Sequence, residues 1–168
     1  MKLAYFSALA GCCLLPLLVS AAEPVITEIM PLNERVLADE DGQFPDWIEL
    51  HNPGVVPLNL GGYFLTDNVL EPAKWAFPQL TLPAGGYLVV FASGKNRIHD
   101  PARLHTSFQL SADGGYVGLA RPDSNVVSSV SYPKTKEDVA FGTARSELST
   151  SLVVNSVPAI LVPAIASE

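Results

Sequence analysis

The stretch Phe44-Pro45-Asp46-Trp47-Ile48-Glu49-Leu50-His51-Asn52-Pro53 decides how this chain folds. Ile48 and Leu50 alternate with Trp47, Glu49 and His51, and a period of two is typical of a β-strand with one buried face. Asn52 and Pro53, followed by a glycine, end the run in a turn. We therefore expect a half-buried strand over residues 46–51 and a turn directly after it.

Short apolar runs of this kind recur along the chain, separated by single prolines and glycines. The 168 residues include 14 Pro and 12 Gly, spread between the runs and not massed in one linker. Residues 87–92 are apolar on both faces and are predicted to be a central strand, and we also expect a strand over residues 104–110. Residues 116–120 and 126–132 should form a hairpin. The pattern predicts an all-β sandwich or barrel.

The N-terminal segment has the composition of a secretory signal. Lys2 supplies a positive charge, residues 3–18 are almost wholly apolar, and small residues follow them. We therefore predict a signal peptide over residues 1–22, a secreted or cell-surface protein, and no membrane span after cleavage. Two alternatives stay open: a bacterial lipoprotein with Cys12 as the lipidated residue, and an uncleaved anchor of marginal length.

Charge and cysteine content exclude several classes of site from the mature chain. Both cysteines lie in the N-terminal segment, which leaves no thiol for disulfides, metal binding or catalysis. The formal net charge of −7 repels phosphate backbones, so nucleic acid is not an expected partner. We predict one globular domain over residues 23–142. Residues 143–168 form a tail that we interpret as an extra strand pair, a frayed end or, preferably, the start of a further module.

Several motifs together resemble the lamin-tail domain family, in its bacterial exported branch. The resemblance covers residues 25–142, and the chain carries a signal segment but no coiled-coil rod. The motifs are, in chain order, Glu28-Ile29-Met30, Asp46–Asn52, Leu60–Asp67, Trp75–Pro78, Leu82–Tyr87, Phe108–Gly114 and Val130–Pro133.

The resemblance implies an immunoglobulin-like β-sandwich that acts in attachment or interaction, with a protein or cell-surface component as its partner. The family has no catalytic residues to carry over, so we expect no enzyme. Bacterial members often stand beside hydrolase modules, which leaves an accessory domain of a secreted hydrolase as an alternative. Polar loops on a rigid sandwich are usual contact sites, and residues 69–74 and 93–101 are the expected ones.

Acidic residues near the deciding strand form the candidate cation site. Asp39, Asp41, Asp46 and Glu49 offer the hard oxygen ligands that calcium binds. Their spacing does not fit an EF-hand loop, because an apolar Leu37 would take its first ligand position. Two hypotheses remain open, a calcium site between loops or carboxylates that cap turns by accepting backbone hydrogen bonds. We expect no other cofactor.

Aromatic and histidine residues carry the remaining hypotheses. Trp47 and Tyr63 would serve a carbohydrate-binding module if both rings were exposed, because flat aromatic rings stack on sugars. His51 and His105 lack zinc-ligand spacing; we expect His51 at the surface or in the turn, and His105 at the surface. The nucleophile-elbow motif of serine hydrolases is absent from the sequence.

Overall fold

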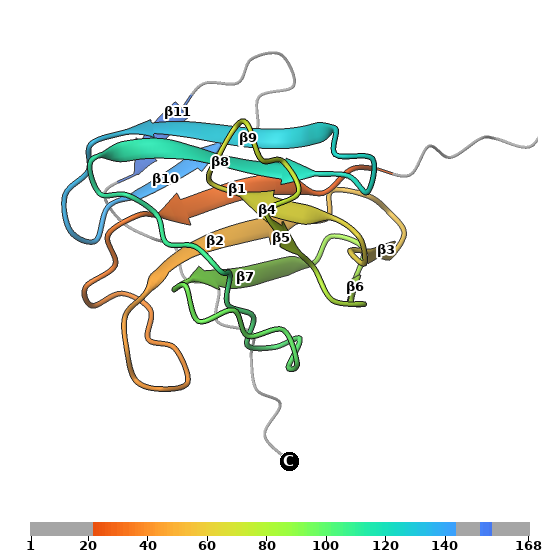
Figure 1. Cartoon of the computed structure of the whole chain (residues 1–168), viewed down its shortest axis with the longest axis horizontal. Coiled ribbons are helices and arrows are strands. Elements are labelled where there is room, and N and C mark those ends of the chain that lie inside the picture. The colour runs from red at the N-terminus through yellow and green to blue at the C-terminus, as the bar shows by residue number, and fades with distance from the viewer. Residues whose placement is uncertain (1–21, 144–151, 156–168) are drawn as a thin grey trace, which may run out of the picture.

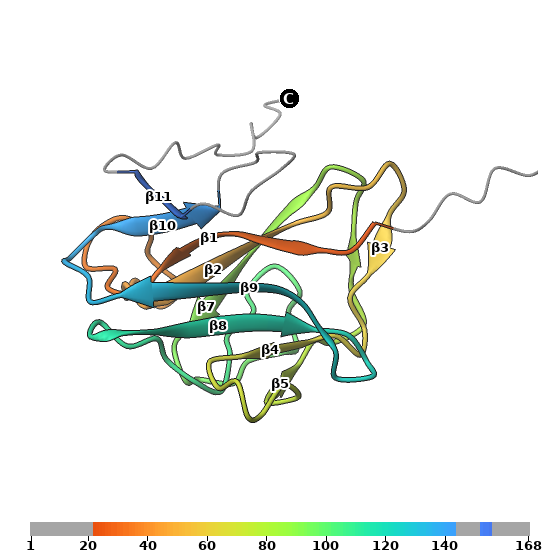
Figure 2. The ribbon, with the colours of Figure 1, turned by 90° about the horizontal axis from the view of Figure 1, so that it is seen from above.

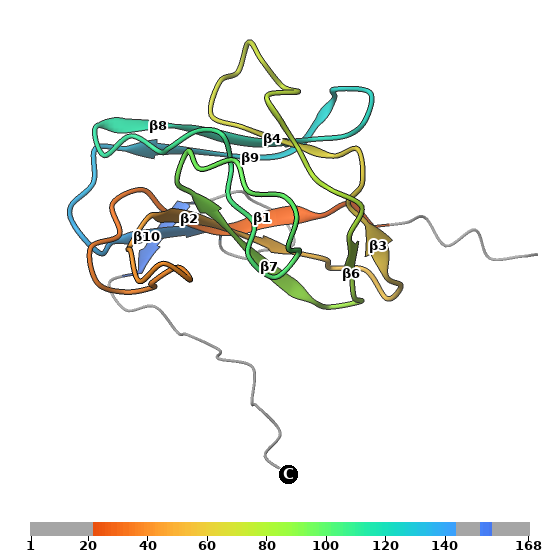
Figure 3. The same ribbon diagram turned by 60° about the horizontal axis from the view of Figure 1, so that its bottom comes forward.

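The structure, a computed structural model, describes residues 22–143 and 152–155, and every regular element in these ranges is a β-strand (Figure 1). The strands form antiparallel sheets that pack as two layers, seen edge-on in Figures 2 and 3. This confirms the all-β prediction and agrees with an immunoglobulin-like β-sandwich. Within the described ranges, no helix has the length and apolar character needed to cross a bilayer. The predicted signal peptide, except for residue 22, lies outside the described residues.

The larger sheet has the strand order β11-β10-β1-β2-β7. The prediction of a central strand over residues 87–92 is wrong, because β7 lies at the edge of this sheet. In β10–β11 pairing, Thr143 lies opposite Leu152 and Ala140 opposite Asn155. β11 belongs to the predicted tail, so this part of the tail adds a strand to the sheet. The rest of the tail, residues 144–151 and 156–168, lies outside the described residues. The five strands are β1 (Val25–Met30), β2 (Asp46–His51), β7 (Tyr87–Ala92), β10 (Ala140–Thr143) and β11 (Leu152–Asn155).

The second layer is a sheet with the order β5-β4-β8-β9, and a short pair, β3 with β6, stands apart from it. The predicted hairpin is β8–β9, in which the Arg121 N–H donates to the Asn125 carbonyl at 2.9 Å. These strands are β3 (Leu58–Asn59), β4 (Phe64–Thr66), β5 (Trp75–Ala76), β6 (Thr81–Leu82), β8 (Gly114–Ala120) and β9 (Val126–Pro133).

The deciding stretch is β2, held between β1 and β7. Ile48 and Leu50 are fully buried in the main core between the two layers. Trp47 points to the opposite face, where it packs with Met30 and Ala140 in a second, smaller apolar cluster. The predicted alternation is confirmed, but Trp47 is also covered, so the strand is not simply half-buried.

Residues 104–110 do not form a strand, contrary to the prediction. Their alternate side chains are buried, as the pattern indicated. The backbone touches the edge of β7 only briefly: the Phe91 N–H donates to the Leu104 carbonyl and the Thr106 N–H to the Phe91 carbonyl, both at 2.9 Å. Alternation here reflects burial against the sandwich and not a continuous ladder.

Candidate functional site

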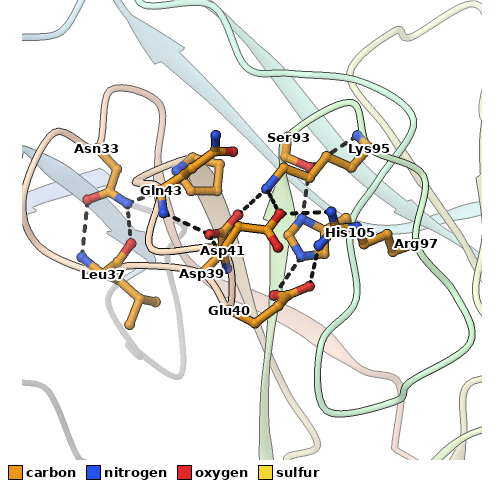
Figure 4. Close-up of polar contacts among 11 residues, drawn as sticks. Asn33, Leu37, Asp39, Glu40, Asp41, Gln43, Ser93, Lys95, Arg97 and His105 are labelled. Atoms are coloured by element: carbon orange, nitrogen blue, oxygen red, sulfur yellow. Dashed lines mark hydrogen bonds and ion pairs between the residues drawn. The ribbon is translucent and has the colours of Figure 1, made fainter.

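Two loops that are distant in sequence meet at one end of the larger sheet. Residues 31–45 lead into β2, residues 93–109 follow β7, and Asp46 pairs with Ala92 where the two strands meet. Polar side chains from the two loops point toward one another in Figure 4. We call the following group the ion-pair cluster: Asp39, Glu40, Asp41, Ser93, Lys95, Arg97 and His105.

Asp39 shapes the tip of the first loop. Its Oδ1 accepts hydrogen bonds from the backbone N–H groups of Asp41 at 3.0 Å and Gln43 at 2.9 Å. The chain reverses through Gly42, whose φ of 72° lies in the left-handed region that glycine adopts at little cost. The Asp39 side chain is fully buried, so its second oxygen requires a partner from elsewhere.

Asn33 holds the base of the same loop. Its Oδ1 accepts the backbone N–H groups of Val36 and Leu37, at 3.0 and 3.2 Å. Its Nδ2 donates to the carbonyls of Leu37 and Pro45, at 2.7 and 2.8 Å. These bonds bring the two ends of the loop together and fix the direction in which the acidic tip points (Figure 4).

Lys95 and Arg97 of the second loop neutralise the acidic tip. The Lys95 ammonium group donates to the carboxylates of Asp39 and Asp41, at 2.7 Å in the case of Asp41. The Arg97 guanidinium group spans the Glu40 carboxylate at 2.6 Å and the Asp41 carboxylate at 2.8 Å. Three carboxylates therefore face two cations, and the two loops are joined by charge.

His105 is fully buried, which corrects the expectation that it lies at the surface. Its Nδ1 is 2.8 Å from Ser93 Oγ and its Nε2 is 3.1 Å from Glu40 Oε2. Ser93 Oγ also accepts the Lys95 backbone N–H at 3.1 Å, so its hydroxyl proton is free to bond Nδ1. A neutral ring with its proton on Nε2 satisfies every partner, and Phe91 stacks on it at 5.2 Å.

The sequence of the chain also identifies its family. The sequence pattern of the Lamin Tail Domain matches residues 20–134, more than half of the chain. The chain belongs to the lamin tail domain family. The matched region includes β1 to β9 and both loops of the ion-pair cluster. The comparison with curated proteins gives no match. The family is one of non-enzymatic immunoglobulin-like domains.

In this lamin tail domain the three carboxyl groups of the cluster have lowered pKa values. The pKa of Glu40 is lowered to about 2, chiefly by its own backbone N–H, with help from His105 and Arg97 against the cost of burial. Hydrogen bonds from Arg97 and Lys95 lower the pKa of Asp41 to about 2. Burial opposes the charge on Asp39, but Lys95 and the backbone N–H groups outweigh it and lower the pKa of that carboxyl.

The four predicted calcium ligands lie in three environments. Asp39 and Asp41 share Lys95, which occupies the position of a counter-cation. Asp46 accepts the Leu110 N–H at 3.2 Å, and Glu49 accepts the hydroxyl of a threonine on β1 at 2.6 Å. The one group of three potential ligand atoms found among the described residues combines Asp39 and Glu40 with His105, and it includes neither Asp46 nor Glu49. The observed bonds of Asp39 are those of the turn-capping hypothesis.

The histidine and aromatic predictions also change. His51 is buried at the end of β2, directly before the turn, and lies against Tyr87, with ring centroids 4.3 Å apart, so of the two positions predicted for it the surface one is wrong. Trp47 is only 5% exposed. Tyr63 is half-buried, and its hydroxyl donates to Glu23 at 2.9 Å. The two rings do not form an exposed platform for a sugar.

The sequence argument missed Lys95, Arg97 and His105 as partners of the acidic segment. The sequence did contain a signal. An acid-rich loop precedes β2 and a loop with basic residues follows β7, and the start of β2 pairs with the end of β7, so the two loops lie at the same end of these strands. The fold brings such loops together whenever the strands between them pair antiparallel. Opposite charges on two loops at the same end of paired strands therefore predict contact between the loops.

Proposed function

We propose that this lamin tail domain is an exported, non-enzymatic interaction module that contacts a protein or cell-surface component through its braced loop end. The observation that carries the proposal is the ion-pair cluster, which joins residues 31–45 to residues 93–105. A surface whose loops are already ordered loses little conformational entropy when a partner binds.

The braced end also presents side chains suited to contact. Phe44 is 41% exposed and Ile98 is 37% exposed, one on each loop. Between the loops the side chains of Arg97 and Asp41 remain about two-fifths accessible, at 42% and 38%. An exposed aromatic and an arginine beside apolar surface are the residue types enriched at protein interfaces. Residues 93–101 are one of the two loops predicted for this role.

The same cluster offers little for catalysis. Ser93, His105 and Glu40 form a hydrogen-bonded chain that resembles a hydrolase triad in composition. The His105 ring is fully buried, and the Ser93 hydroxyl oxygen already accepts the Lys95 backbone N–H. Glu40 and Asp41, each with a pKa near 2, are poorly matched to proton transfer at neutral pH. These features support a binding role over a hydrolytic one.

The test is a binding assay on envelope proteins with the full chain immobilised. A Phe44→Ser/Ile98→Ser variant removes the apolar contacts of the braced end and leaves its ion pairs in place. We expect it to lose the bound component. The control, Val69→Ser/Leu70→Ser, alters two apolar residues on the β4–β5 loop that are more exposed, at 64% and 89%, and should bind like the unmodified chain. Equal binding by both variants would place the contact elsewhere.

A further inference from the structure

The end of the sandwich opposite the ion-pair cluster carries no charge in its two main loops. His51 at the end of β2 pairs with Tyr87 at the start of β7, so the loops that join these strands to β3 and β6 lie together. The chain has ten Lys and Arg and seventeen Asp and Glu, yet none falls within residues 52–66 or 75–94. We call residues 52–57 and 83–87 the uncharged end; Figures 1 and 3 show it beside β3 and β6.

The exposed side chains of the uncharged end are apolar. Val55 is 83% exposed, Tyr87 55% and Val56 45%. Glu23, near the start of the described chain, is paired with Arg121 at 2.9 Å. A contiguous exposed apolar surface marks a contact site with protein or membrane. Five further residues of this end are also exposed: Pro53, Pro57, Pro83, Ala84 and Gly85.

Asn52 makes this apolar surface rigid. It is 1% exposed, and its Nδ2 donates to the carbonyls of Val56 at 2.9 Å, Leu82 at 3.1 Å and Pro83 at 3.0 Å. Its Oδ1 accepts the Gly54 N–H at 2.9 Å. One buried amide therefore fixes both loops of the uncharged end in a single arrangement.

The start of the described chain lies at the same end. Val25 pairs with His51, and a β-carbon built on Gly54 would lie 3.0 Å from Cβ of Ala22. In the sequence, the apolar residues 3–18 come just before this point. If that segment stays attached to the chain, lipidated at Cys12 or uncleaved, its point of attachment at residue 22 lies beside the uncharged end.

We propose that the uncharged end docks against the surface of a lipid bilayer. It lacks the charged side chains that would select a protein partner, and a tyrosine at the border of an apolar patch suits the membrane interface. Two valines and a tyrosine bind a bilayer weakly by themselves, as a single lipid chain does. Where the N-terminal segment stays attached, it tethers the domain and raises its local concentration at the membrane, and docking then orients the ion-pair cluster away from the membrane.

The test measures which end touches lipid. The full chain with Cys12→Ser and Cys13→Ser is inserted into phosphatidylcholine vesicles, and a single cysteine, Val55→Cys or Leu70→Cys, carries an environment-sensitive fluorophore. We expect brominated phosphatidylcholine to quench the label at position 55 about threefold or more, and the label at position 70 little. Equal quenching at both positions, or none at position 55, overturns the proposal. So does a signal at position 55 that depends on protein concentration without lipid, which indicates a protein contact.

A second substitution separates docking from folding. Val56→Asp places a charge on the uncharged end and should abolish quenching at position 55, whereas Val69→Asp adds the same charge elsewhere and should leave it intact. Retained quenching in the Val56→Asp variant also overturns the proposal. In the Phe44→Ser/Ile98→Ser variant the label at position 55 should be quenched as in the unmodified chain. The lipid proposal and the proposed contact at the braced loop end are therefore tested independently.

Discussion

At one end of the larger sheet two loops are joined by ion pairs, and at the other end two loops are joined by the amide of Asn52. Both ends bring together segments that are distant in sequence and bury the polar group that does so. The ion-pair cluster responds to pH and salt because its partners are charged. Asn52 carries no charge, so the uncharged end should keep its shape where the opposite end loosens.

The largest expected effect is at Asn52. Asn52→Ala removes hydrogen bonds to three carbonyls, of which the Leu82 carbonyl is bonded in a buried position, so we expect the free energy of unfolding to fall by about 3 kcal/mol. Urea unfolding measures it. The matched control is Asn59→Ala at an exposed turn, where Asn59 Oδ1 accepts the Gly61 N–H at 2.8 Å, and its cost should stay below about 1 kcal/mol. Similar losses in the two variants would contradict the bracing role of Asn52.

A smaller loss is expected at the charged end. Lys95→Met leaves the buried Asp39 carboxylate without its ammonium partner, and we expect about 2 kcal/mol of destabilisation in urea unfolding. Arg97→Met removes a more exposed cation, whose partners keep other hydrogen bonds, and should cost clearly less. If the Arg97 variant proved the less stable of the two, the buried pair would not be the centre of the brace.

The pH dependence distinguishes two acidic groups seven residues apart. Burial raises the pKa of Asp46 to about 7, whereas the pKa of Asp39 is lowered by Lys95 and backbone N–H groups despite its burial. The folded state therefore binds a proton at Asp46 between about pH 4 and pH 7 that the unfolded state does not, and stability falls as pH rises through this window. Glu40 and Asp41, with pKa values near 2, contribute stability that is lost as pH falls from about 4 toward 2.

Asp46→Asn should flatten the upper part of this profile. Because Asp46 is only half-buried, we expect a change of about 1–2 kcal/mol between pH 4 and pH 7 in the unmodified chain and much less in the variant. Urea unfolding across this range measures both. The loss of stability below pH 4 should persist in the variant, since it arises at the ion-pair cluster. An unchanged slope above pH 4 would contradict the assignment to Asp46.

The smallest expected effect is that of calcium. Lys95 and Arg97 already neutralise the acidic tip, so millimolar Ca²⁺ should shift the melting temperature by less than about 1 °C relative to NaCl of equal ionic strength. Calorimetry provides the measurement. A clear upward shift that Asp41→Asn removes would restore the calcium hypothesis for this loop.

The sequence predicted best what depends on local pattern. The alternation of Ile48 and Leu50 identified β2 and its core face, because a side-chain period of two belongs to the strand itself. The same reasoning failed at residues 104–110, where burial imposes the alternation without a ladder. A strand also requires a hydrogen-bonded partner strand along its length, and the sequence of the segment alone does not predict that partner.

Only the local contacts of the candidate site could be predicted from the sequence, for the same reason. The bonds of Asp39 to Asp41 and Gln43 are local, and they agree with turn capping, one of the two hypotheses that the sequence left open. His105 was misplaced because its partner Glu40 lies 65 residues away. Alternation predicts which way a side chain points, but not what covers it.

The position of β1 determines when the domain can be completed. β1 lies between β2, which follows it closely, and β10, where Ile29 pairs with Phe141. The first strand to be synthesised thus keeps an open edge until nearly the whole domain has been made. Such long-range pairing is slow to form. The larger sheet can therefore be completed around β1 only after β10 has been made, at the end of the domain.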